Sequence, residues 1–114
     1  MAITHHELCF GCGLANLFGL QLELEREGDR VAGRFFAKQD HQGASGDVHK
    51  GILVTALEEA MSLAGGEPHA LEVEFLAPAP IGTFLAVSAS KSEAELRSGD
   101  ELVARALAKG ADPG

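Results

Sequence analysis

Residues 48–61 read VHKGILVTALEEAM, and their pattern indicates the central element of the fold. When successive residues are placed about 100° apart, as on an α-helix, the apolar side chains fall on one wide arc. This spacing predicts a helix from Gly51 to Ala64, and Gly65 and Gly66 end it. An apolar arc that covers most of the helix surface implies contact on most sides, as for a helix wrapped by a curved sheet. The residues that form this arc are Ile52, Leu53, Ala56, Leu57, Ala60, Met61 and Ala64.

Alternating apolar residues on both sides of this helix predict strands. Residues 20–36 read as a β-hairpin whose turn lies at Gly28, a residue that accepts positive φ. After the helix, the alternation predicts further strands over 71–75, 83–90 and 102–107. One helix among antiparallel strands is an α+β arrangement.

The length and composition limit the class of protein. The 114 residues suit one domain, which we place at residues 20–110, after a lead-in at 1–19 and before a tail at 111–114. The net charge of −8 disfavours binding to nucleic acid. No apolar run reaches the roughly 18–20 residues of a membrane span, and residues 1–6 lack the pattern of a secretion signal. We therefore expect a cytoplasmic protein without membrane or nucleic-acid partners.

Cys9 and Cys12 form a Cys-x-x-Cys pair, which is a common half of a zinc site. His5 or His6 offers a third ligand, but the sequence shows no second half-site unless the N-terminus of another subunit supplies one. We therefore predict reduced, partly buried thiols with no metal and no cofactor. Redox catalysis is disfavoured because Cys12 is followed by glycine and not by a helical pattern.

Three segments together resemble the hotdog-fold acyl-CoA thioesterases, including those of the phenylacetate pathway and hydroxybenzoyl-CoA thioesterases. Their order and spacing make the resemblance fairly specific, and it covers most of the chain from Cys9 to about Ala108. The segments are the helix and its approach at 48–61, the lead-in CFGCG at 9–13 with Asn16 and Gly19-Leu20, and VEFLAP at 73–78 with Gly82.

This resemblance implies a long helix wrapped by a curved antiparallel sheet, in a homodimer or homotetramer. It implies hydrolysis of thioesters of coenzyme A or of carrier proteins, at a site where a helix start faces a helix carboxylate, commonly of the other subunit. Free N–H groups at a helix start favour negative charge and so can stabilise an oxyanion. A carboxylate near that point can activate water or attack the carbonyl directly.

Matching the family motif residue by residue assigns the site. Glu58 takes the place of the catalytic carboxylate, His49 that of the histidine in His-Gly-Gly, and Gly51 that of the second glycine. Lys50 stands where the family has its first glycine, whose backbone N–H makes the oxyanion contact. The lysine side chain either blocks the acyl group or attracts the phosphates of the substrate, and the sequence leaves both open. Periodicity alone does not separate Glu58 from Glu59.

Further residues are weaker candidates. His41 and Gln42, in the polar loop at 38–49, are candidates to position substrate or water, although ordinary loop polarity is the better explanation for both. Thr55 is a candidate orienting hydroxyl that otherwise bonds within its own helix. The 26 residues from 83 to 108 hold two strands comfortably and three only if each is short, whereas the family usually has three, so the sequence leaves open whether the sheet is trimmed.

By this resemblance, the sequence predicts a hotdog-like hydrolase that acts on an acyl-CoA or related thioester. Glu58 would activate water or attack the carbonyl, and the helix start around Lys50 and Gly51 would hold the oxyanion. The alternative is a non-catalytic hotdog module that binds acyl-CoA or a small apolar ligand. A dehydratase of the same fold is a weaker third choice, since it needs a catalytic histidine in a different arrangement.

Overall fold

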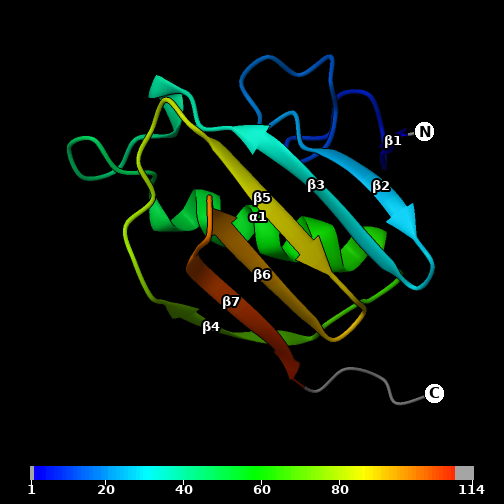
Figure 1. Cartoon of the computed structure of the whole chain (residues 1–114). Helices are drawn as coiled ribbons and strands as arrows, with labels where there is room; N and C mark the ends of the chain where they lie inside the picture. Colours follow the sequence, from blue (N-terminus) through cyan, green and yellow to red (C-terminus); the bar gives the residue numbers. More distant parts are fainter. Residues whose placement is uncertain (1, 110–114) are drawn as a thin grey trace.

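A computed structural model describes residues 2–109 (Figure 1). The predicted tail at 111–114 lies outside the described residues. Within these residues the strands form one antiparallel sheet in the order β1-β2-β3-β5-β6-β7-β4, and a single α-helix, α1, runs from Lys50 to Leu63. The strands are β1 (Ala2–Ile3), β2 (Glu23–Glu27), β3 (Arg30–Phe36), β4 (Ala70–Phe75), β5 (Phe84–Ala89), β6 (Glu93–Ser98) and β7 (Glu101–Lys109).

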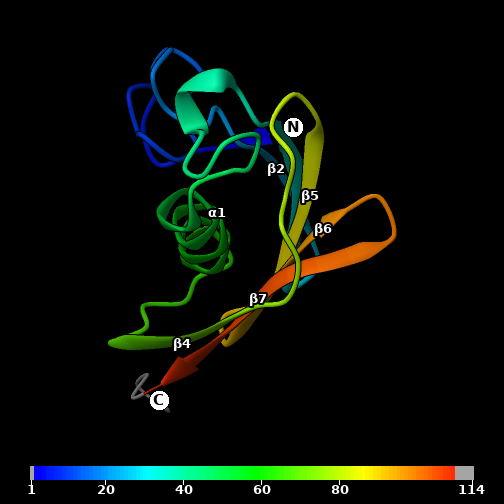
Figure 2. The same cartoon turned by 90° about the vertical axis from the view of Figure 1, so that its left-hand side faces the viewer.

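The sheet curves around α1, as Figure 2 shows when the molecule is viewed along the helix. The helix contacts β3, β5, β6 and β7, and its side chains Leu53, Leu57 and Met61 are buried against them. Such burial of apolar surface is the main source of stability in a small domain. The wide apolar arc of the helix therefore predicted this wrapped arrangement correctly.

The hairpin begins later than its alternating pattern suggests. The pairing of β2 with β3 and a positive φ at Gly28 confirm the predicted turn. Leu20 and Leu22 are buried but lie before β2, because φ of Gln21 is +52° and interrupts the extended backbone. Their N–H groups donate to Phe10 and Gly11 of the lead-in. The alternation of apolar and polar residues therefore identified which side chains of 20–22 are buried, but not that their backbone pairs with the lead-in.

The sheet is not trimmed in the part of the chain that the structure describes. Three strands, β5, β6 and β7, occupy the segment, which confirms the second of the two possibilities, three short strands. The sequence reading missed β6, in which Ala94 and Leu96 are the buried side chains and the remaining positions are polar. Short turns at 90–92 and 99–100 allow the three strands to fit. The sheet ends at β4, which pairs with β7 along one side, so its other side is an open edge within residues 2–109.

Candidate active site

A cavity of about 630 Å³ opens at the start of α1. It lies between the loop before the helix, the first turn of the helix and the segment that follows β4. Its lining is largely apolar, as is usual for small-molecule sites. The lining residues are Gly43, Ala44, Asp47, Val48, His49, Lys50, Leu53, Phe75, Leu76, Ala77 and Pro78.

The first turn of α1 presents one backbone donor to this region. His49 caps the helix, and its Nδ1 accepts the N–H of Gly51 at 2.8 Å. The N–H groups of Ile52 and Leu53 donate to the carbonyl of His49. Among residues 2–109, the Lys50 N–H donates no hydrogen bond. A free N–H at the positive end of a helix dipole is suited to bind a partial negative charge.

The side chain of Lys50 is placed beside the cavity wall. Its Nζ lies 5.1 Å from the ring centroid of Phe75, a cation–π contact that joins the helix start to the end of β4. Both residues line the cavity. The lysine charge is therefore held where a ligand in the cavity would meet it.

Glu58 lies two turns further along α1 and is exposed. Glu58 follows Lys50 by eight positions of helix, which corresponds to about 12 Å along the axis. Glu58 does not line the cavity. Two effects raise the pKa of Glu58: partial burial, which is the larger, and the negative charge of the adjacent Glu59. His5 lowers this pKa by a smaller amount. Within one chain, the helix start and this carboxylate are too far apart to act on the same carbonyl group.

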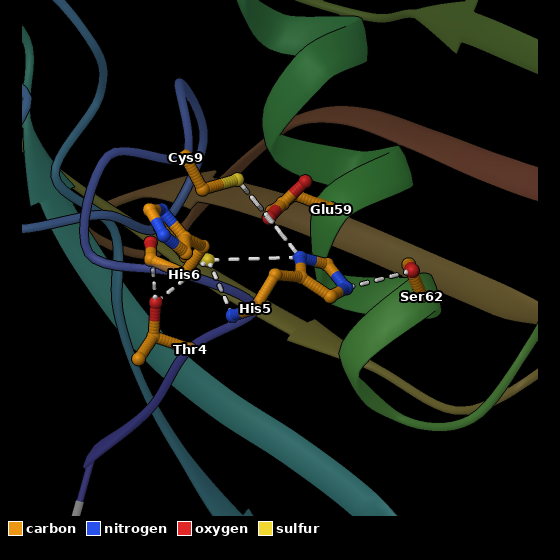
Figure 3. Close-up of polar contacts among 7 residues, drawn as sticks. Thr4, His5, His6, Cys9, Glu59 and Ser62 are labelled. Atoms are coloured by element: carbon orange, nitrogen blue, oxygen red, sulfur yellow. Dashed lines mark hydrogen bonds and ion pairs between the residues drawn. The ribbon is translucent and has the colours of Figure 1, made fainter.

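Glu59, the neighbouring carboxylate, points toward the lead-in. Its side chain is buried, with 7% of the residue exposed. Figure 3 shows it facing His5 and Cys9, whose Nδ1 and Sγ lie 2.7 Å and 3.1 Å from its Oε1. The sequence reading missed this role, because helical periodicity places both glutamates outside the apolar arc and does not separate them. The Cys-x-x-Cys pair was the available signal, but only the fold brings it next to Glu59.

His41 does not reach the cavity. It is buried, with 1% exposed, and its Nδ1 accepts the N–H of Lys38 while its Nε2 lies 3.3 Å from the carbonyl oxygen of Gly19. These contacts tie the polar loop to the lead-in and leave the ring no free nitrogen for a substrate. The structure therefore places His41 in contacts that hold the loop and away from the cavity, and its predicted substrate role stays a prediction.

We expect protonation of His41 to destabilise the fold. Burial lowers the pKa of His41 from 6.5, so the unfolded chain binds this proton more readily than the folded chain. The free energy of unfolding should fall as pH decreases from about 6.5 towards the folded-state pKa. Urea denaturation across this pH range measures the effect. In His41→Gln, the free energy of unfolding should depend less on pH. His69→Gln is the control, because His69 is exposed and its loss should leave the pH dependence unchanged. An unchanged pH dependence in His41→Gln would show that His41 is not its cause.

The other two candidate residues lie outside the cavity lining. Gln42 is exposed, and its Oε1 accepts the N–H of Gly46 within the loop. The Thr55 hydroxyl donates to the carbonyl of Gly51 at 2.8 Å, which is a bond within its own helix. The structure thus brings His49 and Lys50 together at the cavity, with Gly51 capped beside them, and keeps Gln42 and Thr55 away from it.

Solved structures of other proteins share this fold. A crystal structure of a thioesterase superfamily protein has a TM-score of 0.81 at 18% identity, over 93% of this chain and 61% of that one. A phenylacetic acid degradation-related protein from Ralstonia eutropha JMP134 has a TM-score of 0.65 at 21% identity, over 78% and 83% of the two chains. PaaI, from the phenylacetic acid degradation operon of E. coli, gives 0.71 at 15% identity, over 78% and 81%.

These similarities confirm the predicted hotdog fold. This chain spans less than two thirds of the first of those proteins, and the identities establish the fold alone. No protein-family model matches the sequence, and no curated protein is significantly similar to it. Within the described residues, no helix is long and apolar enough to cross a membrane.

Proposed function

We propose that this protein hydrolyses a thioester, of coenzyme A or a related carrier, at a site shared by two copies of the chain. The observation that carries the proposal is the free N–H of Lys50 at the start of α1, on the wall of a largely apolar cavity. A thioester carbonyl needs such a donor for the oxyanion that forms on attack. The fold that the chain shares with thioesterase superfamily proteins supports this class of reaction.

The second copy supplies the carboxylate. Because Glu58 is exposed and about 12 Å along the helix from Lys50, it serves the cavity of another chain and not its own. The open edge at β4 and the exposed side chains of Phe75 and Leu76, which line the cavity, are suited to contact that second copy. We propose a homodimer, which further pairing extends to a homotetramer.

The reaction follows from this placement. The acyl group occupies the cavity, and its carbonyl oxygen accepts the Lys50 N–H. The partner's Glu58 removes a proton from water, whose oxygen bonds to the carbonyl carbon and gives a tetrahedral oxyanion. The C–S bond then breaks, and the thiolate takes the proton from the carboxyl group. In the alternative route the carboxylate attacks first and water hydrolyses the resulting anhydride.

Thiol release from short-chain, long-chain and aromatic acyl-CoA substrates tests this function. The proposal expects turnover of at least one class by an oligomer, with its mass measured in the same sample. A folded oligomer that hydrolyses none of them would overturn the proposal.

The second candidate function is a binding module for acyl-CoA or a small apolar ligand. The observation in its favour is Lys50, whose ammonium group stands beside Phe75 at the cavity in place of the smaller glycine. Lys50→Gly separates the two functions. An enzyme would keep or raise its hydrolysis in this variant, which retains the backbone N–H, whereas a binding module would remain inactive and still bind its ligand in a calorimetric titration.

A further inference from the structure

The lead-in folds over α1 and brings its two cysteines to the helix. The N–H of Cys9 donates to His6, and that of Gly13 donates to Cys9, which turns the Cys-x-x-Cys segment back on itself. Gly11, between the cysteines, packs directly on Glu59, since a Cβ there would lie 2.6 Å from the Glu59 Cδ. A glycine at this point allows the pair to approach the buried carboxylate.

Four potential metal ligands meet at this contact. One ligand atom from each of His5, Cys9, Cys12 and Glu59 lies within 4.8 Å of every other. The His5 Nδ1 is 3.9 Å from the Sγ of Cys9 and 3.6 Å from that of Cys12. Metal–ligand bonds of about 2.0–2.3 Å in a tetrahedron require ligand separations of roughly 3.3–3.8 Å. The sulfur–nitrogen distances are already close to these values.

The shorter contacts are hydrogen bonds that a cation would replace. Glu59 Oε1 lies 2.7 Å from His5 Nδ1 and 3.1 Å from Cys9 Sγ. An opening of about half an ångström gives these pairs tetrahedral separations. Glu59 and Cys12 are buried, and His5 stands at the rim, so the cluster has a dry side and an entry from solvent.

Surrounding groups orient the ligands. The Nε2 of His5 lies 3.0 Å from the Ser62 hydroxyl, which fixes the ring with its Nδ1 toward the cluster (Figure 3). The Sγ of Cys12 accepts the backbone N–H of His5 at 3.1 Å and lies 3.2 Å from the Thr4 hydroxyl. Such second partners of a histidine and a sulfur are typical of metal sites.

We propose that His5, Cys9, Cys12 and Glu59 bind one Zn²⁺ ion. Two thiolates with an imidazole and a carboxylate are the ligand types that zinc takes, and four protein ligands close a tetrahedral site. The ion is therefore structural: it fastens the lead-in to α1, and its binding displaces the thiol protons as it forms two metal–sulfur bonds. This assignment replaces the expectation of free thiols without metal, because the fold supplies the ligand that the sequence lacked.

Metal analysis of the full chain, purified without a histidine tag, tests the site. After incubation with zinc and removal of unbound ions, we expect about one zinc per chain, and zinc should raise the thermal midpoint. Cobalt in its place should give the absorption bands of tetrahedral thiolate coordination. These readouts do not involve thioester hydrolysis, so they stand or fall independently of the proposed function.

Matched variants assign the ligands. Cys9→Ser and Glu59→Gln should lose most of the bound zinc and the zinc-dependent rise in midpoint, while circular dichroism reports whether each still folds. His6→Ala is the control, because His6 is exposed and accepts a local N–H from Leu8 outside the cluster. Zinc well below one equivalent in the unmodified chain, or equal zinc content in folded Cys9→Ser, would overturn the proposal.

Discussion

Glu58→Gln is expected to lower kcat/KM for thioester hydrolysis by about 100- to 10,000-fold, the usual contribution of a general base. Glutamine keeps the size and the hydrogen-bonding shape of the side chain but neither accepts the proton of water nor attacks a carbonyl group. Because Glu58 is exposed, the variant should fold and assemble like the unmodified chain. Thiol release under steady-state conditions measures the loss.

Glu101→Gln provides the matched control for this prediction. Glu101 is exposed at the start of β7, so the substitution removes the same charge without touching α1. Glu59 is unsuitable as a control, since it is buried against His5 and Cys9 and its loss affects the fold of the lead-in. Equal rates for Glu58→Gln and Glu101→Gln would remove Glu58 from the mechanism.

Lys50→Pro is expected to lower hydrolysis by about 100- to 1,000-fold, the usual effect of losing one oxyanion donor. Proline has no backbone N–H, and Lys50 is the first residue of α1, a position where helices accept proline readily. His49 has φ of −59° and ψ of 136°, which is a conformation compatible with a following proline. The substitution therefore deletes the donor and leaves the helix in place, and circular dichroism checks that it does.

Lys50→Ala separates the backbone from the side chain. Alanine keeps the N–H and removes only the ammonium group that stands over Phe75. We expect this variant to retain most of its activity at saturating substrate. If Lys50→Pro is as active as Lys50→Ala, the oxyanion is stabilised elsewhere.

The central helix shows how far sequence patterns reach. Local periodicity predicts a helix from Gly51 to Ala64, within one residue of α1 at each end. It succeeds because the apolar spacing and the helix-ending Gly65-Gly66 pair are both features of neighbouring residues. The resemblance of residues 48–61 to a thioesterase motif then leads to the fold that solved structures share. A short strand with two buried side chains, such as β6, carries too little pattern to be found in the same way.

The candidate site depended more on tertiary contacts. Nothing in the helical pattern distinguishes Glu58 from Glu59, yet the lead-in buries one of them and leaves the other exposed. The pattern of the loop at 38–49 likewise does not reveal that the His41 ring is buried between the backbones of Lys38 and Gly19. Contacts between segments that are distant in sequence determine the roles of these residues. Neither the composition nor the local pattern of the sequence predicts such contacts.

Hydrolysis by mixed oligomers of Glu58→Gln and Lys50→Pro chains tests the shared site most directly. The two chains, carrying different tags, are produced together and purified through both tags. If the helix start of one chain works with Glu58 of the other, each mixed pair holds one intact site and one doubly damaged site. We therefore expect mixed pairs to hydrolyse the thioester at about half the unmodified rate, far above either variant alone. Mixed pairs as inactive as the separate variants would contradict a site built from two chains.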